Sequence, residues 1–348
     1  MGRAVLFVFA FALAAQEPRF DVRSRLVQVP VTVTDSKGRF IDGLQASDFQ
    51  VLDNGRPQQM IVDTIATGVA PIALVIAVQS SGISVPVLEK VRKIGVMIQP
   101  VIVGESGCAA LLSFSDRVAW LQECTNDPDA LAQAFNKLRP GEEKKGRMLD
   151  AAEAAIRRLR GRPGSRRVLL LISESRDRGS ETDLSAVTAA AQSIGVTVYA
   201  ATYSAIKTAF TSQAPLSDPP RPIKPKTPND NMETVDGNPP SKYNPRVAPP
   251  EQRVDVIGGL GELARLGQTN AAQALAGATG GTTVSFARQK GLEEVIAKLG
   301  AELHSQYVLS FVPEAKDPGY HNLEVKLARS GRFRIRARPG YWSAAESQ

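Results

Sequence analysis

A polar loop follows an apolar run at residues 72–78 and reads Gln-Ser-Ser-Gly-Ile-Ser from position 79 to position 84. An apolar run that ends in a small, glycine-containing loop is typical of a buried parallel strand. Open α/β sheets bind their ligands at this end of their strands. Many such loops carry a carboxylate at the first polar position, where this one carries the amide of Gln79. The loop therefore has the position of a ligand site without the charge expected there.

Two basic loops are predicted beside Gln79, at the carboxyl ends of other strands. One contains the run EEKKGR before Met148, and the other contains ESRDRGS after a predicted strand at 168–173. An arginine fork can bind a partner's carboxylate with two parallel hydrogen bonds and without a cation. The loops thus contain candidate partner-binding cations, with ordinary solvated loop charges as the alternative: Lys144, Lys145, Arg147, Arg176 and Arg178.

A third basic feature is the run SGRFRIRARPG near the end of the chain. In a strand, Arg332, Arg334, Arg336 and Arg338 would share one face, and the apolar residues between them the other. We expect these arginines to form the solvated outer face of a half-buried strand, and contact with an anionic envelope polymer is the alternative. No aromatic side chain shares the arginine face for base stacking, so we expect no nucleic-acid partner.

Motifs for catalysis are missing from the sequence. The two histidines, His304 and His321, lie far along the chain from the loop at 79–84, and no G-x-S-x-G motif is present. Zinc would require clustered cysteine and histidine residues, and a phosphate loop would require the G-x-x-x-x-G-K-[ST] pattern. The sequence contains neither pattern. We therefore expect that the protein is not an enzyme.

The two cysteines, Cys108 and Cys124, flank a segment that predicts a β-hairpin with its tip at residues 115–116. If Phe114 pairs with Arg117, Cys108 lies opposite the residue before Cys124. A disulfide between the two cysteines is then close but diagonal, and disulfides have strict distance limits. Two buried free thiols are the alternative.

The start of the chain predicts export. Arg3 precedes an apolar run at 4–13, and small residues follow, as in a secretory signal peptide with cleavage near Ala14 or Ala15. An uncleaved anchor is the alternative. No later segment approaches the ~18 consecutive apolar residues of a membrane-spanning helix. With 43% hydrophobic and 22% charged residues and a net charge of +7, the whole chain has ordinary globular composition, so we expect a secreted or periplasmic protein.

From residue 72 onward the sequence predicts strands that alternate with helices. The predicted strands are at 72–79, 108–115, 118–123, 168–173, 196–201 and 282–286. The predicted helices are at 85–99, 128–138, 149–159, 184–194, 256–266, 271–278 and 292–303. This alternation indicates an α/β fold: a doubly wound, mostly parallel six-stranded sheet with one antiparallel edge strand and helices on both faces.

Both ends of the chain predict β structure. The N-terminal part contains the alternating run LVQVPVTVTD and two strands around a turn at 53–55, and the C-terminal part contains SQYVLSFVPE and GYHNLEVKLA. We expect the two ends to pair in one small β-sandwich, with the α/β domain inserted into it. The expected division is a signal peptide at 1–15, an N-terminal β segment at 16–67, the α/β domain at 68–304 with a Pro-rich disordered insertion at 204–252, and a C-terminal β segment at 305–348.

The α/β portion resembles a von Willebrand factor type A domain, and the chain resembles the exported VWFA-related domain proteins of acidobacteria. The resemblance rests on VPVTVTDSKGRFIDGLQASDFQVLDNGRPQQ near the start, ALAGATGGTTV late in the α/β portion and SQYVLSFVPEAKDPGYHNLEVKL with RARPGYW at the end. These stretches occur in the expected order. Type A domains are chiefly binding modules that hold a partner at the carboxyl edge of the sheet, often through a metal ion adhesion site.

The resemblance also assigns the positions of that site, which the family builds from an Asp-x-Ser-x-Ser loop, a Thr and a second Asp. These positions fall on Gln79, Ser81, Ile83, Gly146 and Glu174, with Asp177 as an alternative for the last. A hard cation such as Mg²⁺ requires oxygen ligands and anionic charge. Gln79 lacks the charge, and Ile83 and Gly146 lack side-chain oxygens, so we expect no divalent cation and no other cofactor. An atypical site of Gln79, Ser81 and Glu174 is the alternative.

Together these features predict a non-catalytic protein-binding or adhesion module with a degenerate metal ion adhesion site. Its partner would be a protein held at the carboxyl edge of the sheet. The alternative is a structural component of the cell envelope whose basic strand contacts an anionic polymer.

Overall fold

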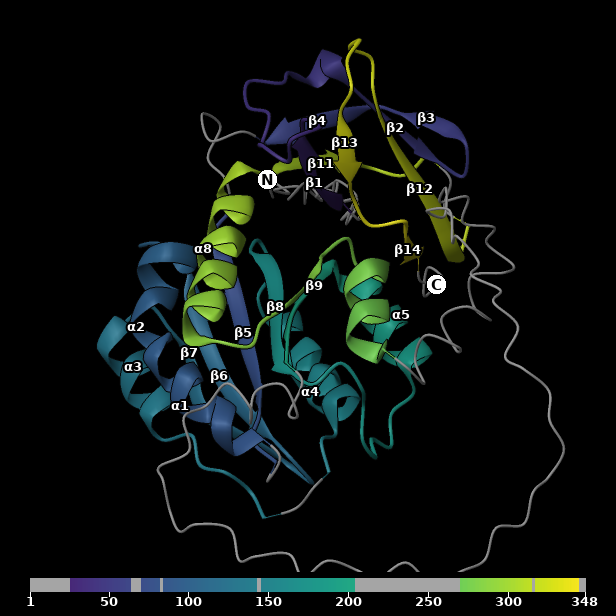
Figure 1. Cartoon of the computed structure of the whole chain (residues 1–348). Coiled ribbons are helices and arrows are strands. Elements are labelled where there is room, and N and C mark those ends of the chain that lie inside the picture. Colours follow the sequence, from purple (N-terminus) through teal and green to yellow (C-terminus); the bar gives the residue numbers. More distant parts are fainter. Residues whose placement is uncertain are drawn as a thin grey trace, which may run out of the picture.

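The computed structural model describes residues 26–63, 70–81, 84–142, 145–203, 270–314 and 317–343. The predicted signal peptide, Ile83, Lys144, the Pro-rich segment and the helix expected at 256–266 lie outside the described residues. The described chain forms an α/β domain and a β-sandwich packed against one end of it (Figure 1). No helix in the described ranges is long and apolar enough to cross a membrane.

The α/β domain is built on a six-stranded sheet of order β10-β9-β8-β5-β6-β7. Its strands are β5 (Ile72–Gln79), β6 (Cys108–Phe114), β7 (Val118–Thr125), β8 (Arg166–Ser173), β9 (Val196–Thr202) and β10 (Thr283–Ser285). Every pair is parallel except β6 with β7. All residues of the central strand β5 are buried, because helices cover both faces of the sheet. The predicted sheet with one antiparallel edge strand is confirmed.

Helices cover the two faces of this sheet in separate groups (Figure 1). One face packs against α1 (Val85–Lys93), α2 (Gly95–Ile98), α3 (Pro128–Asn136) and α8 (Gln289–Ser305). The other packs against α4 (Met148–Arg160), α5 (Leu184–Ile194) and the helical residues 270–278. In α4, the buried residues recur every three or four positions, which is the spacing that places them on one side of a helix.

The single helix predicted at 85–99 is divided. α1 ends before Ile94, the short helix α2 follows, and a π-helical turn covers Gln99–Val103. Gly95 lies so close to α3 that a Cβ atom there would be 2.9 Å from the Cβ of Phe135. Pro100 has no N–H to donate to the preceding turn. Close packing and this proline therefore account for the irregular path, which apolar periodicity does not reveal.

The hairpin of β6 and β7 departs from the predicted register. Phe114 pairs with Val118 and not with Arg117, and two further irregularities along the hairpin bring Ala109 opposite Thr125. Because of this shift, Cys108 does not lie opposite the residue before Cys124, as the predicted register required. The structure joins Cys108 to Cys124 by a disulfide, with the two Cα atoms 5.3 Å apart.

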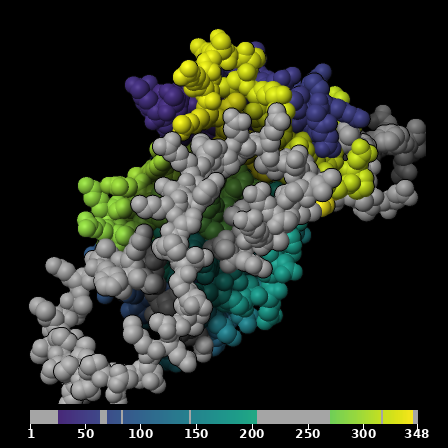
Figure 2. All heavy atoms as spheres, turned by 45° about the vertical axis from the view of Figure 1, so that its right-hand side comes forward, coloured from purple at the N-terminus to yellow at the C-terminus, as the bar shows by residue number. Residues whose placement is uncertain are grey.

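The β-sandwich consists of two four-stranded sheets, of order β13-β1-β11-β4 and β14-β12-β2-β3. Its N-terminal strands are β1 (Val27–Thr34), β2 (Phe49–Asp53), β3 (Arg56–Gln58) and β4 (Met60–Asp63). Its C-terminal strands are β11 (Tyr307–Phe311), β12 (Gly319–Leu327), β13 (Arg334–Arg336) and β14 (Gly340–Ser343). Each sheet combines strands from both ends of the chain, and Figure 2 shows the purple and yellow segments packed together. The predicted shared sandwich is confirmed.

A polar junction connects the two domains where α8 leads into β11. Gln306, the single residue between these elements, donates to the hydroxyl of Tyr199 on β9 at 2.9 Å and to that of Thr32 on β1 at 3.2 Å. Tyr199 in turn donates to the carboxylate of Glu302 at 2.6 Å, and Arg336 of β13 pairs with the same carboxylate. The junction therefore holds the sandwich to one end of the sheet with buried hydrogen bonds.

Candidate functional site

Gln79 ends β5 at the carboxyl edge of the sheet and is only 1% exposed. Its amide nitrogen donates to the hydroxyl of Ser81 at 2.9 Å. Its amide oxygen accepts the backbone N–H of Glu174, also at 2.9 Å. Both ends of the amide are therefore used within the protein, and the Gln79 side chain links the loop after β5 to the loop after β8.

A line of hydroxyl groups continues inward from Ser81. The hydroxyl of Ser81 lies 3.2 Å from that of Ser84, which lies 2.7 Å from the hydroxyl of Tyr203. Burial raises the pKa of Tyr203, although its hydrogen bond with Ser84 opposes this shift. Tyr203 is therefore neutral and keeps a proton to donate. The serines of the loop thus form an internal network.

Gly146 lies against the amide of Gln79. A Cβ atom at this position would be 2.6 Å from the amide nitrogen of Gln79 and 3.0 Å from its amide carbon. Two backbone hydrogen bonds, from Gly146 N to Arg178 O at 3.1 Å and from Arg178 N to Gly146 O at 3.0 Å, hold the glycine in place. Gln79 and Gly146 are therefore complementary, because the amide occupies the space that any side chain at 146 would need.

The two candidate carboxylates have separate roles. Glu174 is 13% exposed and accepts from the Nε of Arg178 at 2.9 Å. Asp177 instead accepts the backbone N–H of Leu149, at 3.0 Å, and the hydroxyl of Ser180, at 2.6 Å. Asp177 therefore stabilises the N-terminus of α4, where unpaired N–H groups favour a carboxylate. Glu174 is the carboxylate that lies beside Gln79.

The candidate partner-binding cations divide into paired and unpaired groups. Arg147 pairs with Glu181 at 2.8 Å, and Arg178 pairs with Glu174. Lys145 and Arg176 are exposed and form no ion pair within the described residues. The loop that carries Lys145 and Arg147 follows α3 and not a strand, in contrast to the prediction, but it returns to the carboxyl edge.

Four assigned positions thus meet at one point of the carboxyl edge: Gln79, Ser81, Gly146 and Glu174. They do so on a sheet with the strand order and the single antiparallel edge strand described above. The α/β domain has the von Willebrand factor type A fold. The loops that carry these four positions lie on the side away from the sandwich, which packs against the opposite end of the sheet.

No family model and no curated protein matches the sequence. Among solved structures, an aerotolerance-related membrane protein from Bacteroides fragilis is 14% identical, with 66% of this chain and 98% of that chain covered and a TM-score of 0.41. A von Willebrand factor type A protein from Catenulispora acidiphila is 8% identical, with 94% and 76% covered and a TM-score of 0.45.

Proximal thread matrix protein 1 from the mussel byssus, described with a zinc-occupied MIDAS motif, is 10% identical, with a TM-score of 0.45. Here 72% of this chain is covered, and the match spans 49% of the mussel protein. At these scores the similarities carry no functional inference for this chain.

The residues at this edge do not suit the divalent cation of an adhesion site. The amide of Gln79 already makes hydrogen bonds at both ends, Gly146 supplies no side-chain oxygen, and the carboxylate of Glu174 is paired with Arg178. A hard cation needs several free oxygen ligands with net negative charge. Within the described residues, no group of three or more His, Cys, Asp or Glu side chains is arranged to hold a metal.

The sandwich contains a buried polar cluster that the sequence did not predict. His321 lies 2.9 Å from the carboxylate of Asp53, and Tyr341 donates to the same carboxylate at 2.9 Å. The other ring nitrogen of His321 lies 2.8 Å from the carbonyl oxygen of Asp317. The cluster connects β2, β12 and β14 and is closed to solvent, so its role is structural. Only the pairing of the two chain ends could have placed Asp53 beside His321.

The arginine row of the C-terminal segment is not a solvated face, in contrast to the prediction. Arg336 pairs with the buried Glu302, and Arg338 is buried between the two domains. Only Arg332 and Arg334 are exposed. The strand β13 is short and pairs with β1 near the domain junction, so the second half of the row faces the α/β domain.

Proposed function

We propose that this chain is an exported, non-catalytic protein-binding module that holds its partner at the carboxyl edge of the type A sheet without a divalent cation. The observation that carries the proposal is the amide of Gln79, which spans Ser81 and the backbone of Glu174 while packed on Gly146. This arrangement gives the edge a fixed shape. It also replaces the charged ligand set through which such an edge would hold a metal.

Attraction for the partner then comes from fixed positive charge. Lys145 and Arg176 are exposed beside the site, and neither forms an ion pair with a described residue. Arg147 and Arg178 hold their carboxylates at partly exposed positions, where ion pairs are weak and can exchange for a partner's carboxylate. The complementary partner is a protein with an acidic surface.

The disulfide between the two cysteines supports export of the protein. Disulfides persist in oxidising compartments such as the periplasm and the extracellular space. The Cys108–Cys124 disulfide supports the predicted signal peptide, which lies outside the described residues. The alternative role, contact of a basic strand with anionic envelope polymer, loses support because Arg336 and Arg338 are engaged inside the protein.

The test is capture of partners from envelope extract, followed by affinity measurement with and without a chelator. We expect unchanged binding in the chelator and about tenfold weaker binding for Lys145→Gln/Arg176→Gln, because each exposed ion pair is worth about 0–1 kcal/mol and tenfold corresponds to about 1.4 kcal/mol for the two together. Lys298→Gln/Arg332→Gln removes the same charge from exposed positions elsewhere and serves as the control. Binding that disappears in the chelator would contradict the proposal.

A further inference from the structure

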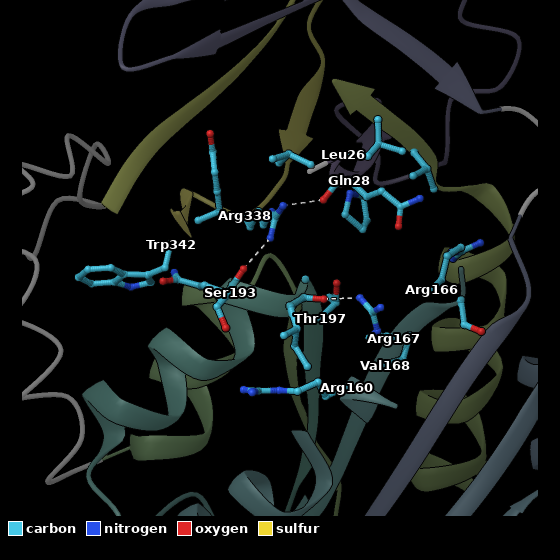
Figure 3. Close-up of a pocket in the computed structure, with 18 of the residues that line it drawn as sticks. Leu26, Gln28, Arg160, Arg166, Arg167, Val168, Ser193, Thr197, Arg338 and Trp342 are labelled. Atoms are coloured by element: carbon cyan, nitrogen blue, oxygen red, sulfur yellow. Dashed lines mark hydrogen bonds between the residues drawn. The ribbon is translucent and has the colours of Figure 1, made fainter. Parts of the chain in front are cut away.

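A cavity of about 510 Å³ lies between the two domains, at the amino end of the type A sheet. The start of β8 and the end of α5 line it from the α/β domain, and β1 and β14 line it from the sandwich. In Figure 3, Arg338 approaches from the sandwich side, and Arg160, Arg166 and Arg167 come from the α/β domain. This end of the sheet is opposite the carboxyl edge, so the cavity is separate from the site of the proposed function.

The cavity is lined by these four arginines and, in the part of the chain that the structure describes, by no aspartate or glutamate. Arg338 is 6% exposed, and its guanidinium donates to the backbone carbonyls of Gln28 at 2.7 Å and Gln192 at 3.1 Å. Arg166 is also buried and donates to the carbonyl of Leu303. None of the four arginines forms an ion pair with a described residue. Carbonyl oxygens accept hydrogen bonds from Arg166, Arg167 and Arg338 but do not compensate their charge, and the Nε of Arg338 is buried without a partner among the described residues.

Uncompensated buried charge is unusual, because removing an arginine from water is costly unless an anion accompanies it. Burial lowers the pKa of Arg338 to about 10 and also lowers the pKa values of Arg166 and Arg167. A carboxylate in the cavity would offset this burial. No side chain of the described residues supplies one there, which leaves the position open to the anionic group of a ligand.

The mouth of the cavity is apolar. Leu26 and Trp342 line it and are 53% and 41% exposed, which is high for large apolar side chains. Pro30 and Val308 add further apolar wall. The cavity volume lies within the range of about 300–1,000 Å³ that is usual for small-molecule sites. A flat anionic polymer would not reach Arg166 and Arg338, because both are recessed.

We propose that this cavity binds a small organic anion, with its carboxylate or phosphate group among the four arginines and its apolar part against Leu26 and Trp342. Positive charge alone would also accept inorganic anions, and an apolar wall alone would accept neutral compounds. The two features together therefore define this ligand class. Both domains contribute to the site, so a bound ligand stabilises their contact.

The test is calorimetric titration of the full chain with hexanoate, hexyl phosphate, hexanol and inorganic phosphate at constant ionic strength. We expect saturable binding of at least one of the two amphiphilic anions and none of hexanol, and the preferred head group distinguishes carboxylate from phosphate. Absence of binding by both amphiphilic anions would overturn the proposal. Equal affinity for inorganic and hexyl phosphate would overturn the apolar contact.

Substitutions of residues that line the cavity test whether the anion binds there. Arg160→Gln changes an exposed residue with no side-chain hydrogen bond among the described residues, so the variant should fold normally. We expect it and Arg167→Gln each to weaken binding by about tenfold, the effect of losing one charge-assisted contact. Ser193→Asp places a carboxylate on the cavity wall and should also weaken binding. Arg332→Gln, outside the cavity, should change nothing. Wild-type affinity in Arg160→Gln/Arg167→Gln would overturn the site assignment.

Discussion

The two edges of the type A sheet have opposite electrostatic arrangements. At the carboxyl edge, where the fold ordinarily binds ligands, Gln79 is hydrogen-bonded at both ends and Glu174 is paired with Arg178. At the amino edge, Arg166 and Arg338 are buried and donate to carbonyl groups, and neither forms an ion pair with a described residue. The side chains at the carboxyl edge thus satisfy one another, while the buried arginines at the amino edge have no ion-pair partner among the described residues.

The two edges also differ in the interactions that hold them together. The ion pair of Arg178 with Glu174 is half exposed on the arginine side, and such pairs contribute about 0–1 kcal/mol. The carboxyl edge is therefore held mainly by the buried amide of Gln79 and its fit to Gly146. The amino edge is held by the donors of Arg338, which link Gln28 of the sandwich to Gln192 of α5.

The largest expected effect concerns this link. Arg338→Ala should lower the free energy of unfolding by about 2–4 kcal/mol, because two carbonyls lose their donor and each such loss costs about 1–3 kcal/mol. Urea denaturation measures the change. The control is Arg332→Ala, an exposed residue without an ion pair among the described residues, which should have almost no effect. Equal stability of the two variants would show that Arg338 does not hold the domains together.

A smaller effect is expected at the carboxyl edge. Gly146→Ala should destabilise the protein by about 1–3 kcal/mol, the usual cost of overpacking, because the new Cβ would lie 2.6 Å from the amide of Gln79. The matched control is Gly277→Ala, where a Cβ would meet nothing within 4 Å. The combination Gln79→Ala/Gly146→Ala should cost less than the sum of its parts. Strict additivity would mean that the two residues are independent.

The sequence was most informative where local pattern and burial agree. β5 is apolar up to Gln79 because it lies in the middle of a covered sheet, and the alternation in β1 reflects one buried face. The turn at Asn54 and Gly55, with φ values of 48° and 79°, was also predictable from its residue types. The positions of strands and of this turn could therefore be predicted from short-range signals, whereas the register of the β6–β7 hairpin could not.

Contacts between distant residues could not be predicted in the same way. Glycine at position 146 indicated the loss of a ligand oxygen, but not that the amide of Gln79 fills the space beside it. The alternation around Arg338 predicted one face of a strand, but not that this face meets α5. In both cases the outcome depends on which elements pack together, and that information is not contained in local periodicity.

A pH-dependent effect of intermediate size is expected in the sandwich. Burial lowers the pKa of His321, but the carbonyl of Asp317 and the carboxylate of Asp53 raise it by more, so that it lies above the ordinary value of 6.5. The stabilisation from protonated His321 is therefore complete below about pH 6.5 and is lost as the pH rises through the pKa of the folded state.

Urea denaturation from about pH 6 to about pH 9, followed by the fluorescence of Trp342 in a Trp120→Phe background, measures this loss. The stability of the sandwich should decrease across this range in the wild type and be nearly constant in His321→Gln. A slope of equal size in both proteins would assign the pH dependence to other groups.

The smallest expected effect is that of divalent cations. Mg²⁺, Mn²⁺ or Ca²⁺ at millimolar concentration should leave the melting temperature unchanged, because the amide of Gln79 and the carboxylate of Glu174 already have partners. Binding at ~100 times the Kd would add about 2.7 kcal/mol, which a melting curve detects readily. The triple variant Gln79→Asp/Ile83→Ser/Gly146→Thr restores the ligand types that the resemblance assigns. If the triple variant is stabilised by Mg²⁺ and the wild type is not, then these three positions alone account for the difference. Chelator-reversible stabilisation of the wild type that disappears in Ser81→Ala would instead show that the carboxyl edge holds a cation with Gln79 in place. The two edges would then differ in the kind of ligand they bind, a cation at one and an anion at the other, and the carboxyl edge would no longer be self-sufficient.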